Sequence, residues 1–141
     1  MLAIALSAEA LRARRAVRQV ADRRLSYPCR VSLTDAELGE EVVLVHYEHQ
    51  RADTPYRSSH AIYVRQGEET YDAVDAVPDQ LRRRMLSLRA FDDRGMIVGA
   101  DLVDGRAVEG AIATLLADPR AAYLHAHFAK FGCYAARIER A

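Results

Sequence analysis

The stretch LSLRAFDDRGMIVGADLV, residues 86–103, decides the fold that we expect for this chain. Residues 86–91 and 96–103 have the composition of two β-strands. The four residues between them, Asp92 to Gly95, are a turn signal, because acidic residues followed by glycine favour a tight reversal. Two strands joined by so short a connection pair antiparallel. This hairpin therefore predicts an antiparallel sheet.

The rest of the chain supplies further short elements. Ser7 can cap a helix that reaches about Arg15, whereas residues 16–22 fit helix or strand and stay open. Residues 29–33 and 41–49 alternate as two strands, and the polar segment TDAELG between them predicts a hairpin. Residues 71–84 suit a loop or one helical turn. Helical spacing covers 108–117, and further strands are expected at 60–65, 122–128 and 133–138.

The expected fold class is α+β. About seven strands form a mainly antiparallel sheet, open or curled toward a barrel, with an N-terminal helix and one helix before the C-terminal hairpin. At 141 residues, the chain has the size of one domain, so we predict a single domain over residues 1–141. Twenty basic residues balance twenty acidic ones, and this neutral total predicts no nucleic-acid partner.

Cysteine content and the opening residues predict a cytoplasmic protein. Cys29 and Cys133 are too few for a disulfide framework, so reduced thiols are expected, with a single bridge as the alternative. The opening MLAIALSAEA has no basic residue ahead of its apolar run, unlike a secretory signal. Ten residues are also too few to cross a bilayer, so we expect no membrane contact.

The C-terminal hairpin holds the densest group of reactive side chains. Strand alternation places Tyr123, His125 and His127 on one face. Turn length decides which partner side chains join them, because a shift of one residue moves every side chain to the other face. We expect a three-residue loop over 130–132, with Gly132 in the left-handed conformation.

This register would place His125 opposite Arg137 and Cys133 diagonal to His127. A four-residue loop would instead place the histidines beside Tyr134. In the first case, a neighbouring imidazolium or guanidinium would activate the Cys133 thiol as a nucleophile. The two histidines, with Cys133, could also bind a divalent metal such as zinc, and Arg137 could hold an anion. The alternative is an ordinary polar sheet face.

Other candidates lie outside this hairpin. Asp101 is a carboxylate within an apolar strand and is either paired with an arginine or a general acid or base. The loop that carries Arg57 and Ser59 and leads to His60 could grip an anion, although solvated loop polarity would look the same. Cys29 shares a face with apolar residues and is expected in the core.

Four stretches resemble a bacterial family of proteins of unknown function, DUF1203. They are YPCRVSLTDAELGEEVVLVHYEHQ, TPYRSSHAIYVR, LSLRAFDDRGMIVGADLVDG and YLHAHFAKFGCYAARIER, and together they cover most of the chain from Tyr27 to Arg140. The combination of YPCR with GCYAAR is the most specific part of the likeness. The resemblance implies a bacterial stand-alone domain and no mechanism.

Two functions are therefore compatible with the sequence. The first is a small-molecule enzyme, with or without a metal, in which His125, His127, Cys133 and Asp101 supply the chemistry. Arg137, Arg57, Ser59 and His60 would bind a small anionic substrate. The second is a non-catalytic domain in which the same surface binds a ligand or a protein, including a second copy of this chain. Fold analogy cannot separate the two.

Overall fold

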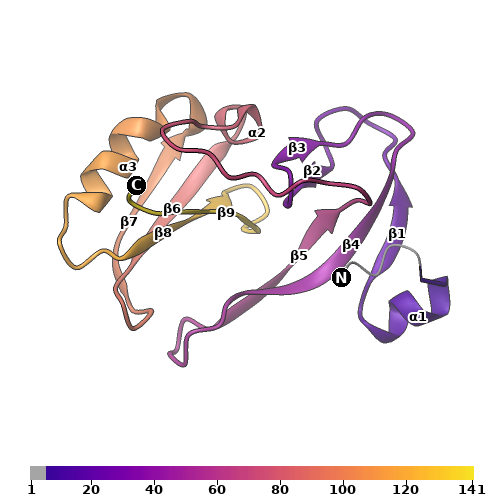
Figure 1. Cartoon of the computed structure of the whole chain (residues 1–141), viewed down its shortest axis with the longest axis horizontal. Helices are drawn as coiled ribbons and strands as arrows, with labels where there is room; N and C mark the ends of the chain where they lie inside the picture. Colours follow the sequence, from indigo (N-terminus) through magenta and orange to yellow (C-terminus); the bar gives the residue numbers. More distant parts are fainter. Residues whose placement is uncertain (1–5) are drawn as a thin grey trace. The chain divides into compact units, whose positions relative to one another are not determined.

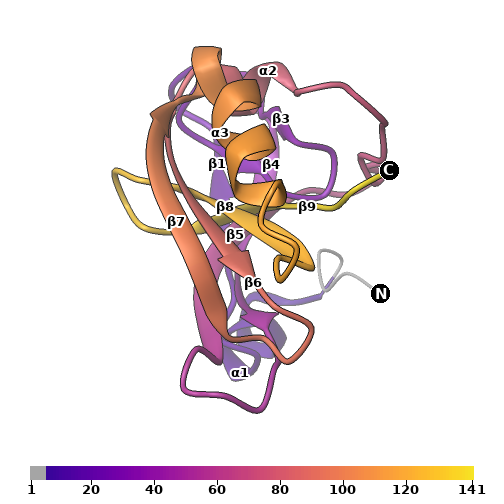
Figure 2. The same ribbon diagram turned by 90° about the vertical axis from the view of Figure 1, so that its left-hand side faces the viewer.

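A computed structural model describes residues 6–141, so the prediction for the opening segment falls partly outside the described residues. The described chain is α+β and forms nine strands in two mostly antiparallel sheets (Figures 1 and 2). The first sheet has the order β1 (Val17–Val20), β4 (Glu41–Gln50), β5 (Ser58–Val64), β2 (Pro28–Cys29) and β3 (Thr34–Asp35). The second has the order β7 (Ile97–Asp104), β6 (Met85–Phe91), β8 (Tyr123–Phe128) and β9 (Tyr134–Ile138).

The predicted fold class is confirmed, with nine strands in place of about seven. Within residues 6–141 neither sheet closes on itself, so no closed barrel forms. The three α-helices are α1 (Ala8–Ala13), α2 (Asp79–Arg82) and α3 (Val108–Leu116), and a 3-10 turn, η2 (Gly105–Ala107), precedes α3. None of the helices in the described part of the chain is long and apolar enough to cross a membrane.

The chain divides into two compact units. The first comprises Met1–Tyr47 and His60–Asp72, and the second comprises Glu48–Ser59 and Ala73–Ala141. The end of β4, the loop after it and the start of β5 therefore belong to the second unit; we call Glu48–Ser59 the arm. The expectation of a single domain stays a prediction.

In the first unit, the predicted helix is confirmed, and Ser7 caps it by accepting a hydrogen bond from the amide of Ala10. The predicted hairpin between residues 29–33 and 41–49 is wrong. β2 instead pairs antiparallel with β3 and parallel with β5, while β4 pairs with β1. The reason is local: Leu33 turns the chain with a left-handed φ of 54°, so Cys29 already pairs with Thr34. β4 is left to pair with Val17–Val20, the segment that the sequence did not resolve.

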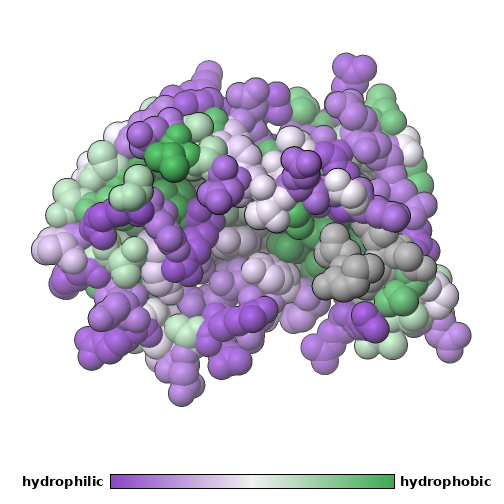
Figure 3. Space-filling model, in the orientation of Figure 1, coloured by the Kyte–Doolittle hydropathy of each residue, from purple (hydrophilic) through white to green (hydrophobic). Residues whose placement is uncertain are grey.

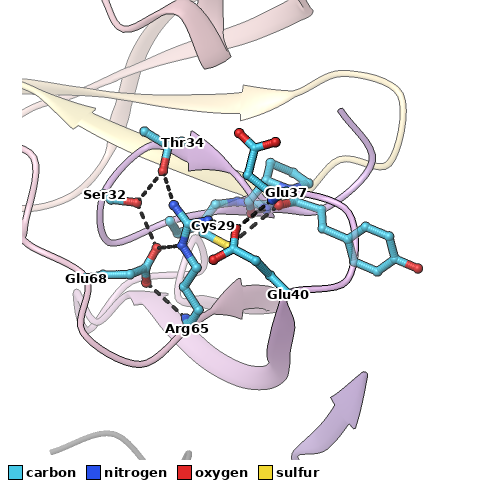
Figure 4. Close-up of polar contacts among 10 residues, drawn as sticks. Cys29, Ser32, Thr34, Glu37, Glu40, Arg65 and Glu68 are labelled. Atoms are coloured by element: carbon cyan, nitrogen blue, oxygen red, sulfur yellow. Dashed lines mark hydrogen bonds and ion pairs between the residues drawn. The ribbon is translucent and has the colours of Figure 1, made fainter. Parts of the chain in front are cut away.

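Polar contacts link β3 to the residues that follow β5 in this unit (Figure 4). The guanidinium of Arg65 lies between Glu40, 2.6 Å away, and Glu68, 3.4 Å away, and it also donates to Thr34. The carboxylate of Glu68 is almost fully buried and also accepts from Ser32 at 2.7 Å. A buried carboxylate is tolerated only when it is paired and hydrogen-bonded, as here. We therefore assign this network a structural role.

Cys29 lies beside this network and belongs to the core, as the sequence predicts. Its side chain is fully buried and packs with Ala21, Ala36 and Val42. Burial, and then the charge of Glu68, raise the pKa of its thiol to about 12. A thiol with this pKa is uncharged at neutral pH and is a poor nucleophile.

The second unit confirms the predicted hairpin of residues 86–103. β6 and β7 pair antiparallel around the turn at Asp92, whose carboxylate accepts from the amides of Arg94 and Met96. These hydrogen bonds to the charged form lower the pKa of Asp92. The helix predicted over 108–117 is also present, as α3, and it covers one face of this sheet (Figure 2). Its leucines pack with Ala90, Ala121 and Leu124.

This packing fixes the face of β8 that carries the histidines. Leu124 faces α3, so His125 and His127 point to the opposite side of the sheet, as strand alternation requires. Neither histidine is solvated, however, and their relative exposures are 2% and 1%. By contrast, hydrophilic side chains cover much of the molecular face shown in Figure 3. The reading of the histidines as part of an exposed polar sheet face is therefore wrong.

Candidate metal centre

The register of the β8–β9 hairpin decides what lies next to the histidines. The amide of Phe128 donates to the carbonyl oxygen of Cys133, so the loop has four residues and His127 lies opposite Tyr134. The expected three-residue loop is wrong at this end of the hairpin. A register shift between Ala126 and His127 then restores the other pair, and His125 lies opposite Arg137 as predicted. Gly132 takes the predicted left-handed conformation, with a φ of 76°.

The register shift is a β-bulge in β9. It explains why neither the three-residue nor the four-residue loop register holds along the whole hairpin. It adds one residue to β9 between the two pairs, so that Tyr134 and Arg137 both face the side of β8 that carries the histidines. A regular hairpin would have placed only one of them there. The bulge therefore gives the site an aromatic ring at one end and a guanidinium at the other.

A third histidine joins the pair from the arm. His49, near the end of β4, places a ring nitrogen in one group with nitrogens of His125 and His127, all within 4.8 Å of one another. The ring of His49 lies 5.0 Å from that of His127 and 6.0 Å from that of His125, measured between centroids. All three residues belong to the second unit. Three imidazoles thus converge on one point.

Hydrogen bonding prepares His127 to act as a ligand. Its Nδ1 lies 3.0 Å from the carbonyl oxygen of Gly132, and a carbonyl can only accept, so Nδ1 carries the proton. In a neutral imidazole this leaves the lone pair on Nε2. Metal-binding histidines are commonly oriented by a backbone carbonyl in this way. The left-handed turn at Gly132 thus orients the ring as well as the hairpin.

His125 is neutral and lacks a partner for one nitrogen. Its Nδ1 is buried and has no hydrogen-bond partner among residues 6–141. Burial lowers the pKa of its imidazole to about 3, and the nearby His49, His127, Arg137 and Arg89 act in the same direction. A buried polar atom without a partner is uncommon and calls for an explanation. A bound cation would supply one.

Aromatic rings wall the group. Tyr134 stacks on His49 with ring planes 5° apart and centroids 5.1 Å apart, and it meets the edge of His125 at 5.1 Å. Phe91 lies 5.0 Å from His125 on the other side and stacks on Tyr123 at 5.3 Å. These rings hold the imidazoles in place and limit the access of water.

Contacts of the arm with the second sheet position His49. The side-chain amide of Gln50 donates to the hydroxyl of Tyr123 at 2.9 Å, and Thr54 donates to the carbonyl oxygen of Gly95 at 3.2 Å. Gly95 itself, with a φ of 85°, packs so closely that an added Cβ would lie 2.3 Å from the Cβ of Ala52. The β6–β7 turn is therefore the surface on which the arm packs.

The substitution Gly95→Ala should accordingly destabilise the second unit by about 2–4 kcal/mol. A left-handed alanine costs about 1–2 kcal/mol, and overlap with Ala52 adds to this. Urea unfolding followed by circular dichroism measures the loss. Gly67→Ala is the matched control, because Gly67 has a φ of 79° but open space around it within the described chain. The double variant Gly95→Ala, Ala52→Gly should regain the steric part. An equal loss of stability in the two alanine variants would contradict the close packing of the arm on Gly95.

Two arginines flank His125 in the sheet. Arg89 of β6 and Arg137 of β9 are its two cross-strand neighbours, so their side chains share its face. Arg137 lies over the ring of Tyr123, 4.0 Å from its centre, and donates to Glu139 at 2.5 Å. The Arg89 side chain forms no hydrogen bond or ion pair with any residue from 6 to 141, and burial lowers the pKa of its guanidinium. No local sequence pattern singles out Arg89.

The structure does not bring the other predicted residues to this group. Cys133 is buried, but its sulfur is not among the clustered ligand atoms. Asp101 lies exposed on the edge strand β7 and accepts from the amide of Leu102. Arg57 pairs with Glu48 at 3.1 Å. Ser59 ends the arm, and His60 belongs to the first unit.

His49 is the member of the three-histidine group that the sequence does not reveal. It lies far along the chain from the His-x-His pair, and only tertiary structure brings them together. His46 and His49 point to opposite faces of β4, so their own spacing carries no signal. An unexplained histidine at the end of a long apolar strand is the only hint, and it is a weak one.

Three imidazoles without a thiolate or carboxylate are a donor set for a transition metal. Zinc sites with three protein ligands keep a fourth position open for water or substrate, and this is the pattern of catalytic sites. Magnesium and calcium prefer oxygen donors, which this group of ligand atoms does not contain. The donor set therefore suits an ion such as Zn²⁺.

A family model described as "Protein of unknown function (DUF1203)" matches residues 26–140. No curated protein and no solved structure matches the chain. The matched range includes all three histidines of the group and both arginines beside His125.

Proposed function

Because the chain belongs to the DUF1203 family, whose description names no activity, we propose its function from the site itself. His49, His125 and His127 bind one divalent transition metal, zinc being the best match, and the protein is a metal-assisted enzyme that acts on a small anionic molecule. The observation that carries this proposal is the convergence of three imidazole nitrogens within 4.8 Å, two of them from buried side chains.

The distances fit an ion after a small adjustment. Tetrahedral zinc holds its nitrogen ligands at about 2.0–2.1 Å, which puts them about 3.3 Å from one another. The group is wider than this by up to about 1.5 Å, so ion binding would draw the rings together. Rotation of the His49 ring, which is only partly buried, can supply this movement. His127, fixed by Gly132, would stay in place.

Protonation also favours a metal over a structural histidine cluster. Three adjacent imidazoles cannot all carry charge in a buried site, and the pKa of His125 shows that its neutral form is strongly preferred. Neutral imidazole is the form that binds metals. The bound ion would activate a water molecule or polarise a carbonyl or phosphoryl oxygen. The chain's own residues would orient the ligand and exclude bulk water.

The alternative is a domain that binds its ligand at the metal without turnover. One observation favours it: the group of ligand atoms, as far as the described chain shows, contains no carboxylate that could act as a general base. Tyr134 and Tyr123 both lie against the imidazole rings and could transfer a proton in its place. The two cases differ in the presence of turnover and not in metal binding. In either case we propose a bacterial cytoplasmic protein with a small-molecule ligand.

Metal analysis of the purified protein tests the centre. We expect one equivalent of Zn²⁺ or Co²⁺ after reconstitution, with a Co²⁺ absorption spectrum of the intensity given by four or five ligands. Bound metal should also raise the melting temperature, since a ligand that binds only the folded state stabilises it. Protein that retains no metal and shows no thermal shift would exclude the proposal. Turnover of small carboxylate and phosphate esters by metal-loaded protein would then separate enzyme from binding domain.

A further inference from the structure

The row of side chains across the second sheet points to the ligand of the metal centre. Arg89, His125 and Arg137 lie side by side on β6, β8 and β9. We propose that Arg89 binds the oxyanion group of a small carboxylate or phosphate ligand held at the three-histidine centre. This inference rests on the proposed metal site and adds the residue that selects the ligand's chemistry.

The charge around the proposed metal centre favours an anionic ligand. Three neutral imidazoles leave the full charge of a divalent ion uncompensated, and two guanidiniums lie beside His125. Glu139 neutralises one of them through its contact with Arg137. A divalent ion and Arg89 then remain without a counter-charge in a largely buried place. Such a concentration of positive charge favours a bound anion.

The guanidinium of Arg89 lacks the partners that a partly buried arginine normally has. A partly buried guanidinium normally finds a carboxylate or a carbonyl oxygen, because it carries five donors and never loses its charge at physiological pH. Arg89 has neither partner within the described chain, unlike its neighbour Arg137 and unlike Arg57. Its donors are therefore available on the face of the sheet that carries the histidines. The planar fork of arginine suits the two oxygens of a carboxylate or phosphate.

Arg137, the arginine that the sequence suggested, is less available than Arg89 to bind an anion. Arg137 is half-exposed, paired with Glu139 and stacked on Tyr123. Reorienting it toward a ligand would break both contacts. Arg89 has no such contacts to break within the described chain. Arg89 thus binds the anion, and Arg137 supports the aromatic wall.

Titration of Co²⁺-loaded protein with acetate and with inorganic phosphate tests the inference. The visible spectrum should change on anion binding, and Arg89→Met should weaken this binding at least about tenfold while the Co²⁺ stoichiometry stays the same. Arg89→Lys should recover part of the affinity, because it keeps the charge without the fork. Arg106→Met, an exposed arginine paired with Asp104, controls for general electrostatics and should have no effect. Whether acetate or phosphate binds more tightly distinguishes the two ligand classes.

The outcomes separate this inference from the metal site. Anion binding that is absent, unaffected by Arg89→Met, or weakened more by Arg137→Met would overturn the role of Arg89 while the metal centre stood. If wild-type protein bound no Co²⁺, the metal centre would fail, and calorimetric titration of the metal-free protein would judge Arg89. Affinity that depends on Arg89 would then support the oxyanion site alone. Its absence would refute the site too.

Discussion

Replacing His49 by alanine should lower the affinity for Zn²⁺ by at least about a hundredfold. Removing a residue that only orients a zinc ligand commonly costs 10- to 100-fold, and loss of one of three ligands costs more. Competition with a zinc-binding dye measures the affinity directly. We expect losses of the same order for His125→Ala and His127→Ala, since the three nitrogens form a single group.

His46→Ala is the matched control for this series. His46 lies on the same strand but is exposed and belongs to the first unit. Its substitution should leave zinc affinity unchanged. A protein that tolerates loss of His49 as well as it tolerates loss of His46 would have only two histidine ligands, and the centre would need a different third donor.

The metal-free protein should lose stability as pH falls below about 6.5. In the folded state the pKa of His125 is about 3, against an ordinary value of 6.5 for a solvated histidine. Between these values the unfolded chain binds a proton that the folded protein excludes, so acid favours unfolding. The contribution of His125 is complete above pH 6.5 and falls by about 1.4 kcal/mol per pH unit until about pH 3.

Urea unfolding in the presence of a chelator, at several pH values, measures this slope. The pKa values of Asp104 and Asp118 are lowered to about 2 by Arg106 and Arg120, and Arg82 lowers the pKa of Glu109. These carboxylates affect stability only where the unfolded chain begins to protonate them, near their ordinary pKa of about 4. Measurements above about pH 5.5 therefore isolate the histidines. His125→Phe should flatten the dependence, whereas the exposed His46→Phe should not. Equal slopes in the two variants would show that His125 does not titrate as its burial requires.

Local patterns predicted the elements that depend on near neighbours. The 86–103 hairpin, the helix beginning at Ser7 and α3 follow from turn residues, caps and periodicity, which act over a few residues. Pairing between distant strands was beyond this reasoning. β4 alternates as a strand in any sheet, and only tertiary packing determines that β1 is one of its two neighbours. The failed hairpin of residues 29–33 with 41–49 has this origin.

The candidate site, like the fold, was predictable only in part. Alternation correctly placed His125 and His127 on one face, but it could not show that this face is buried. The bulge in β9 lies beyond simple register arguments, and it decides that Tyr134 and Arg137 both face the histidines. His49 and Arg89 come from other strands and carry no local signal. Residues that meet through tertiary structure alone are the ones that the sequence could not assign.

The arm carries a consequence for the life of the protein in the cell. The arm carries one proposed ligand, His49, and β8 carries the other two. A bound ion would therefore link two segments that the ribosome synthesises at different times. Without the proposed ion, the arm would be held by its contacts with the second sheet alone, so proteases would cut metal-free chains there first. If the proposed centre holds zinc, the amount of the protein would thus follow the zinc supply.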